Sequence, residues 1–111
     1  MKILVVEPGK HPSTQEIKGD LASMQEVVGG LIQAIYPFEE DVALICNEEG
    51  KLLRLPPNRV LRDDKGRIYD VICGTFFLCA APTDSDSFEG LNAEQLDRYA
   101  QHFYPIEFFI S

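Results

Sequence analysis

Apolar residues in this chain come in short runs separated by polar turns, a pattern typical of a small protein built from strands and helices. The first run, Lys2 to Glu7, is rich in β-branched residues and predicts a buried strand that ends at Pro8-Gly9. The segment from Thr14 to Lys18 is expected to return as a second strand and form a hairpin with the first. Asp20 then caps a helix that ends at Gly29-Gly30.

The centre of the chain, Asp41 to Leu61, is its most informative stretch. Val42 to Asn47 is continuously apolar and predicts a buried strand, and Asn47 to Gly50 has the chemistry of a hairpin turn. Lys51 to Leu55 is therefore expected to be the returning strand. Pro56-Pro57 must then leave the sheet, because neither proline can donate to a ladder.

The second half of the chain continues with short elements. Arg62 to Arg67 predicts a turn, and the apolar run from Tyr69 to Ala81 is divided by Gly74 into two short elements. Pro82 to Gly90 is a polar loop.

A second helix follows this loop. Asn92 and Gln95 have the spacing of a capping box, and the helix is expected to end before Pro105. The apolar tail 105–111 must pack somewhere: as a last strand, against the core, or in an interface, including one between two copies of the chain.

Together these elements predict the fold class α+β: a single compact domain, residues 1–111, with a mixed five- or six-stranded sheet and two helices. Leu31 to Tyr36 resumes as a strand after the first helix. The strands that flank this helix could therefore be parallel, with a right-handed crossover.

Charge narrows the classes of partner. The 111 residues carry a formal net charge of −8, which disfavours direct binding to nucleic acid or to anionic membranes. The segment Lys51 to Arg67 is the exception, with six basic residues against two acidic ones, a net +4 that leaves −12 on the rest of the chain. This segment is either a set of solvated loops and strand faces or an anion-binding patch.

The corner Leu55 to Arg59 is the best candidate for a ligand site. Arginine pairs with phosphate and carboxylate in a bidentate manner, and Asn58 can cap a turn. The candidate ligand-binding residues are Arg54, Asn58, Arg59, Arg62, Arg67 and Tyr69. The alternative is a rigid connector whose arginines pair with Asp63, Asp64 or Asp70.

No catalytic, metal or cofactor site is predicted. The three cysteines, Cys46, Cys73 and Cys79, each lie in an apolar run and have no zinc-site spacing, which favours reduced, packed thiols and a cytoplasmic protein. Cys46, at a strand end, is the least implausible nucleophile, although a buried structural thiol is the simpler interpretation. The first apolar run is too short for a signal peptide or a membrane span.

Two central stretches, VALICNEEGKLLRLPPNRVL and IYDVICGTFFLC, resemble domain-of-unknown-function family 3846, and the opening MKILVVEPGK and the helix LNAEQLDRYAQHF fit the same family. The resemblance covers nearly the whole chain and implies a phage or mobile-element setting in Firmicutes. It brings no catalytic residues.

Three functions therefore stay open. The first is a non-enzymatic accessory module that binds a protein partner or a small anionic ligand. The second is an acidic decoy of a host nucleic-acid-binding or defence protein. The third is a nucleotide- or anion-binding protein, sequestering or enzymatic, that uses the basic corner 54–67.

Overall fold

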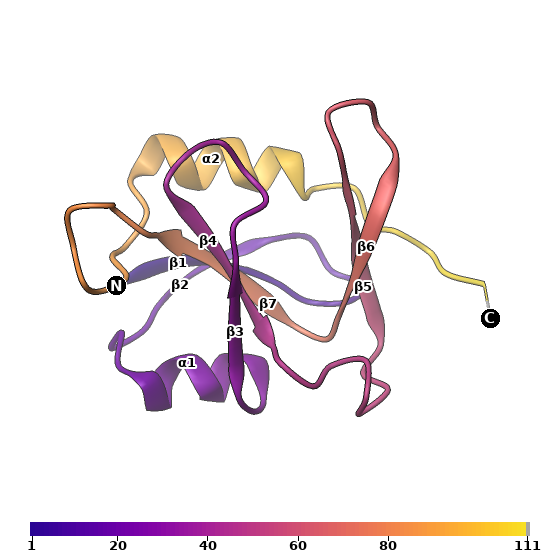
Figure 1. Cartoon of the computed structure of the whole chain (residues 1–111), viewed down its shortest axis with the longest axis horizontal. Helices are drawn as coiled ribbons and strands as arrows, with labels where there is room; N and C mark the ends of the chain where they lie inside the picture. The colour runs from indigo at the N-terminus through magenta and orange to yellow at the C-terminus, as the bar shows by residue number, and fades with distance from the viewer. Residues whose placement is uncertain (111) are drawn as a thin grey trace.

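The computed structural model describes residues 1–110, in which seven strands form two sheets and are accompanied by two helices (Figure 1). In chain order the elements are β1 (Lys2–Val6), β2 (Ser13–Glu16), α1 (Leu21–Val28), β3 (Ile32–Ile35), β4 (Val42–Asn47), β5 (Pro57–Arg62), β6 (Ile68–Cys73), β7 (Phe76–Ala80) and α2 (Ala93–His102). The predicted α+β class with two helices is confirmed. Within these residues, neither helix has the length and apolar composition needed to cross a bilayer.

The main sheet has five strands in the order β2-β1-β7-β4-β3, and every neighbouring pair is antiparallel. The predicted β1–β2 hairpin is confirmed, with Lys2 opposite Glu16. The expectation of a mixed sheet is wrong. Four antiparallel steps give β2 and β3, which flank α1, the same direction, but these two strands lie at opposite edges and do not pair.

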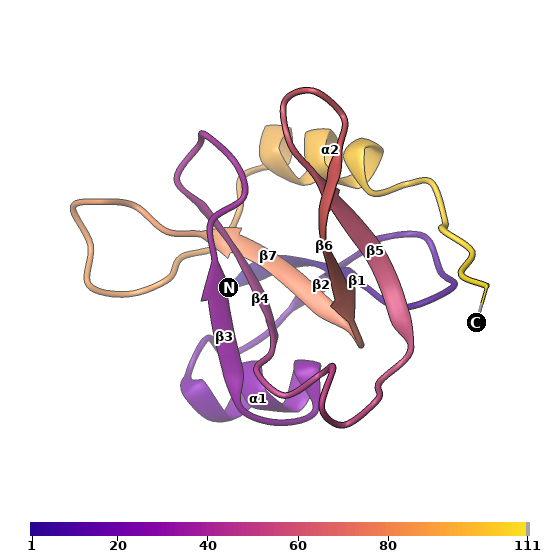
Figure 2. The same ribbon diagram turned by 45° about the vertical axis from the view of Figure 1, so that its right-hand side comes forward.

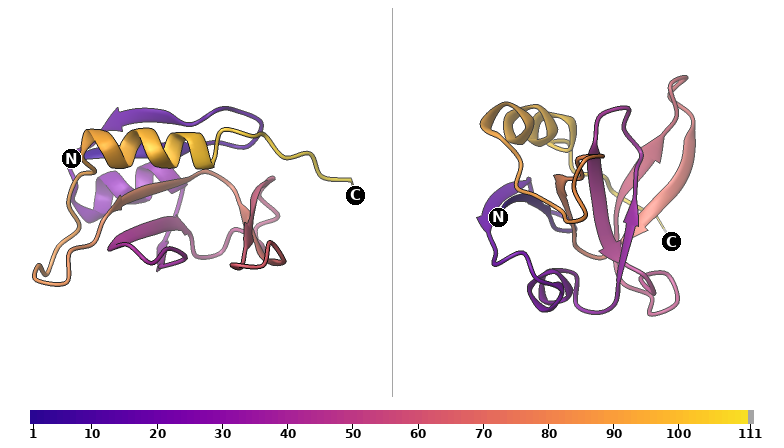
Figure 3. Two further views of the ribbon diagram at one scale, coloured as in Figure 1. Left: turned by 90° about the horizontal axis from the view of Figure 1, so that it is seen from above. Right: turned by 60° about the vertical axis from the view of Figure 1, so that its left-hand side comes forward.

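The two helices cover opposite faces of this sheet (Figures 1 and 3). Ile3 and Val5 of β1 belong to the core cluster that includes α1, whereas Leu4 and Val6 belong to the cluster that includes α2. The strands between the edges are thus buried on both faces, which explains why they read as continuous apolar runs rather than as an alternation.

The residues predicted to cap the N-termini of the two helices are confirmed as caps. The Asp20 carboxylate accepts a hydrogen bond from the Ser23 backbone N–H at 2.9 Å, and α1 ends at Gly29 in the left-handed conformation. Asn92 and Gln95 form the reciprocal capping box of α2, with both hydrogen bonds present.

The expected strand Lys51–Leu55 is wrong: this segment is a coiled turn. The N–H of Leu53 donates to Glu49 O at 2.8 Å, and the N–H of Leu55 donates to Gly50 O at 2.9 Å. The physical reason is that both edges of β4 are already paired, one with β3 and the other with β7, so a returning strand has no edge to join. Leu52, 77% exposed, lies on the outside of this turn.

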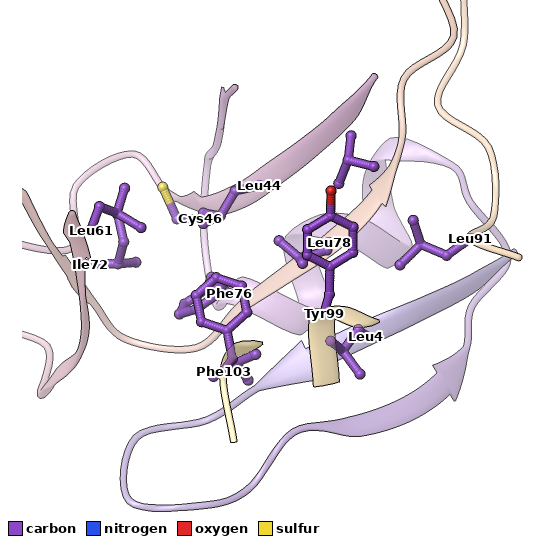
Figure 4. Close-up of a cluster of buried hydrophobic side chains, with 12 residues drawn as sticks. Leu4, Leu44, Cys46, Leu61, Ile72, Phe76, Leu78, Leu91, Tyr99 and Phe103 are labelled. Atoms are coloured by element: carbon purple, nitrogen blue, oxygen red, sulfur yellow. The ribbon is translucent and has the colours of Figure 1, made fainter. Parts of the chain in front are cut away.

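The expectation that Pro57 leaves the sheet is also wrong, because β5 begins at that proline. Pro57 is the first residue of the strand, one of the positions where a missing N–H is tolerated. β5 pairs with β6 in a separate hairpin, whose register shifts twice. Leu61 and Ile72 anchor this hairpin to the α2 side of the core (Figure 4).

The remaining predictions concern breaks and the tail. Gly74, with φ of 87°, separates β6 from β7 as expected, and residues 81–90 form a loop closed by a bridge between Ala80 and Glu89. Residues 105–110 form no strand; they run outward past the end of α2 and beside β5 (Figures 2 and 3). Ser111 lies outside the described residues.

Candidate binding site

A buried pair of polar side chains fixes the β5–β6 hairpin to the rest of the molecule. Asn58 and Arg59, at the start of β5, are each only 1% exposed. The Asn58 amide nitrogen donates to Val6 O at 2.8 Å and to Gly74 O at 2.9 Å. It therefore ties β5 to the end of β1 and to the break between β6 and β7.

Arg59 makes the longer connections. Its guanidinium donates twice to Phe103 O, at 3.0 and 3.2 Å, and once to Lys10 O at 2.8 Å. Its remaining nitrogen donates to the Asn58 side-chain oxygen at 2.8 Å and to the Asn58 carbonyl at 3.3 Å. Because Phe103 is the C-cap of α2, the positive charge also meets the negative end of that helix.

All three guanidinium nitrogens of Arg59 are thus engaged by protein oxygens. Burial lowers the pKa of Arg59, and the nearby Glu107 carboxylate opposes that shift. An arginine has five N–H donors, and five hydrogen bonds are present, so binding an anion here would require breaking bonds of the fold. This geometry fits the connector interpretation of the corner.

The other predicted site residues lie apart from this pair. Arg62 is half-exposed, and its Nη1 lies 3.3 Å from the Glu107 carboxylate. Arg67 pairs with Asp63 in the hairpin turn at 3.4 Å. Arg54 is exposed on the turn before β5, with a left-handed φ of 56°.

The basic segment is therefore not a basic patch. Of its six cations, Arg59 is buried, whereas Lys51, Arg62 and Arg67 are paired with Asp70, Glu107 and Asp63 respectively. The Lys51–Asp70 pair joins the coiled turn to β6, and that hydrogen bond raises the pKa of Lys51. Asp63 is already counted in the net +4 of this segment, whereas Asp70 and Glu107 lie outside it and offset two of those four charges.

A cavity of about 460 Å³ lies between the β5–β6 hairpin, the C-terminal end of α2 and the segment after β3. Of the predicted site residues it brings together Arg59, Arg62 and Tyr69; Arg54, Asn58 and Arg67 are not in its lining. Its apolar wall comes from six residues, Pro37, Phe38, Val60, Leu61, Phe103 and Pro105. His102 also lines it, and partial burial lowers the pKa of that imidazole, which keeps it neutral at neutral pH.

The tail borders this cavity and a second hollow of about 510 Å³ on the same hairpin. Val60, Arg62 and Glu107 line both. The Glu107 carboxylate accepts a hydrogen bond from the Val60 N–H at 2.9 Å and so occupies an outward-facing donor of the β5 edge. We define the hairpin–tail surface as the exposed apolar side chains of β6 and the tail that line these hollows, together with the exposed residue that follows them in the chain: Ile68, Tyr69, Phe108, Phe109 and Ile110.

Sequence reasoning missed Phe38, His102 and Glu107 as parts of the site. Each comes from a segment remote from the hairpin in sequence, and Phe38 contacts the end of α2 through Tyr99, Phe103 and His102. The sequence feature that pointed to this site was the tail, whose adjacent aromatic residues cannot all be buried.

The two buried thiols have raised pKa values. Burial raises the pKa of Cys79 to about 12, and burial together with the Asp70 charge raises the pKa of Cys46. A low thiol pKa is what a nucleophilic cysteine requires. Within residues 1–110, no group of three or more His, Cys, Asp or Glu residues is placed to hold a metal ion.

Comparison with known proteins gives a family and no function. No curated protein and no solved structure matches the chain. The model of a family described as a domain of unknown function, DUF3846, matches residues 1–104, which include every strand and helix of the fold and end just before the tail. The chain therefore belongs to the DUF3846 family of domains of unknown function.

Proposed function

We propose that this protein is a non-enzymatic binding module and that its ligand is a protein partner, which docks on the hairpin–tail surface. The observation that carries the proposal is the exposure of large apolar side chains there. Tyr69 is 57% exposed and Phe108 is 91% exposed, and Ile110 is fully exposed. Contiguous exposed apolar surface next to a hollow is typical of a protein interaction site.

The two hollows that these side chains line adjoin each other, because they share lining residues. Ile68, Phe108 and Phe109 line one hollow, and Tyr69 lines the neighbouring cavity, with Val60 and Arg62 common to both. Aromatic residues of this kind supply most of the free energy of binding at protein interfaces. A partner that covers both hollows would bury all of them.

The two alternatives gain less support. A small anion would meet Arg59, whose N–H groups are engaged, and Arg62, which is paired with Glu107. A decoy of nucleic acid needs acidic side chains on one face, whereas Glu26 of α1 and Glu94 of α2 lie on helices that cover opposite faces of the sheet. A protein partner is the ligand that best fits the exposed apolar surface.

The test compares substitutions of exposed aromatic residues on and off this surface. The wild-type protein is used to recover partners from cells of its own host, and each candidate is purified and titrated by isothermal calorimetry. We expect the double variant Tyr69→Ala/Phe108→Ala to weaken binding about 30-fold or more, because truncating an interface aromatic residue costs about 2 kcal/mol or more.

Tyr36→Ala is the control, since Tyr36 is 61% exposed but lines a different hollow, beside the loop after β7, and neither of the two hollows on the hairpin. Circular dichroism would check that each variant keeps its fold. Equal binding by the wild type and the double variant would show that the partner docks elsewhere and would remove the basis of the proposal.

A further inference from the structure

The charged residues that line the cavity beside the hairpin are on balance acidic, although the segment 51–67 is on balance basic. Its charged lining consists of two arginines and three carboxylates: Arg59, Arg62, Asp63, Asp64 and Glu107. The Arg59 charge is held by backbone and amide oxygens deep in the fold. Four of these five groups have identified partners.

Asp64 is the exception. Asp63 accepts hydrogen bonds from the N–H groups of Lys65 and Arg67 and pairs with the Arg67 guanidinium. Glu107 accepts hydrogen bonds from the Val60 N–H and from the Arg62 guanidinium. In the part of the chain that the structure describes, the exposed Asp64 carboxylate makes no hydrogen bond or ion pair. The rim therefore presents one carboxylate free to bind a cation.

The rest of the cavity suits an apolar group. Phe38, Leu61 and Phe103 form much of its wall, and the neutral His102 adds no charge. A volume of about 460 Å³ lies within the range of roughly 300–1,000 Å³ found for small-ligand pockets, large enough for an amino-acid side chain. The cavity also opens onto the hairpin–tail surface, so its occupant can belong to a larger molecule.

We propose that the cavity recognises a short segment of the partner protein in which an apolar side chain lies next to a lysine or arginine. The apolar side chain enters the cavity, and the cation pairs with Asp64 at the rim. This inference rests on the proposed function and adds to it the chemistry of the partner. The net charge of −8 would attract a basic segment at long range as well.

The experiment selects ligands without assuming a sequence. A displayed library of random twelve-residue peptides is panned on the full-length wild-type protein, and only clones that lose binding to the Tyr69→Ala variant are kept. The expected consensus is an aromatic or aliphatic residue within one or two positions of Lys or Arg. Fluorescence anisotropy with the selected peptides should show Asp64→Asn weakening binding about two- to fivefold, the value of one exposed ion pair.

Charge reversal provides the control. Panning on Asp64→Lys should replace the basic residues of the consensus with Asp or Glu, whereas Asp84→Lys should leave the consensus basic, because Asp84 is an exposed carboxylate on the loop after β7 and does not line the cavity. Both proteins carry the same change in net charge, so a general charge effect would appear in both.

The outcomes separate this inference from the proposed function. Clones that depend on Tyr69 but show no basic preference, or whose consensus ignores the Asp64→Lys change, would overturn the partner chemistry and leave the docking surface in place. Failure to obtain any clone that depends on Tyr69 would overturn both.

Discussion

Replacing Arg59 with methionine tests whether this residue is a structural connector rather than a ligand site. Methionine keeps much of the side-chain length and removes every donor, which leaves Phe103 O, Lys10 O and the Asn58 side-chain oxygen without their partner in a buried region. Each hydrogen bond from a charged donor contributes about 1.5–3 kcal/mol, and removing the buried charge recovers part of that loss. We expect a net destabilisation of about 3–5 kcal/mol.

The measurement is urea unfolding followed by far-ultraviolet circular dichroism, since the chain has no tryptophan to report by fluorescence. Arg62→Met is the control: Arg62 is half-exposed and makes one ion pair with Glu107, so its loss should cost about 1 kcal/mol or less. Arg59→Lys should fall between the two, because an ammonium group cannot reproduce the fork that reaches both Phe103 and Lys10.

If Arg59→Met does not fold, the Arg59→Lys value still decides the question. A destabilisation no larger than that of Arg62→Met would refute the connector interpretation. It would mean that the observed hydrogen bonds contribute little to the stability of the native state, and an anion-binding role for Arg59 would regain its physical basis.

Three further predictions concern local structure. Gly74→Ala should lower the free energy of unfolding by about 2 kcal/mol, about 1 kcal/mol more than Gly66→Ala does, in thermal or urea unfolding. Both glycines have positive φ, but of the two only Gly74 is so placed that an added Cβ would meet Leu55, at 2.7 Å. Equal costs would contradict this. Asn92→Ala should cost about 1 kcal/mol in the same assay through loss of the capping box, and no loss would show that α2 is held by packing alone. Hydrogen bonds from Tyr99, Gln95 and Arg98 lower the pKa of Glu40 from 4.5, so the stability that its charge contributes is present above pH 4.5 and is lost as the pH falls through the lowered pKa. The difference in urea midpoint between the wild type and Glu40→Gln should therefore shrink from pH 6 to pH 3, and a constant difference would refute the link.

The sequence predicted those parts of the fold that depend on short-range chemistry. Asp20 and Asn92 were identified as helix caps because the capping side chain and its target lie within three residues. The apolar run Val42–Asn47 was identified as a strand because burial on both faces leaves a continuous pattern. In each case the decisive interaction or periodicity lies within a few residues of chain.

The errors arose where a strand needs a distant partner. Lys51–Leu55 has a strand-like pattern, but β4 has no free edge for it, a fact that depends on the pairing of β3 and β7. The Pro57–Arg62 strand was missed because prolines argue against a sheet interior, whereas β5 starts at its proline and lies in a separate hairpin. Sheet order is a property of the whole chain, so local patterns could not supply it.

The prediction of a basic site failed for a related reason. Counting charges along the segment 51–67 gave +4, but charge in space depends on which carboxylates the fold brings near, and Glu107 reaches Arg62 from 45 residues away. The same folding that pairs Arg62 with Glu107 leaves Asp64 without a partner and the apolar tail exposed. The segment that looked basic therefore became part of an apolar and mildly acidic surface.

On this hairpin, different residues therefore contribute to stability and to binding. Asn58 and Arg59 are buried and hold β5 against β1 and the end of α2, so they set the position of the cavity without being available to a ligand. Tyr69 and Phe108 are exposed and contribute little to the core, so they are free to contact a partner. A substitution in the first pair should change the fold and the site together, whereas one in the second pair should change binding alone. That difference is what allows loss of binding to be assigned to the surface rather than to unfolding.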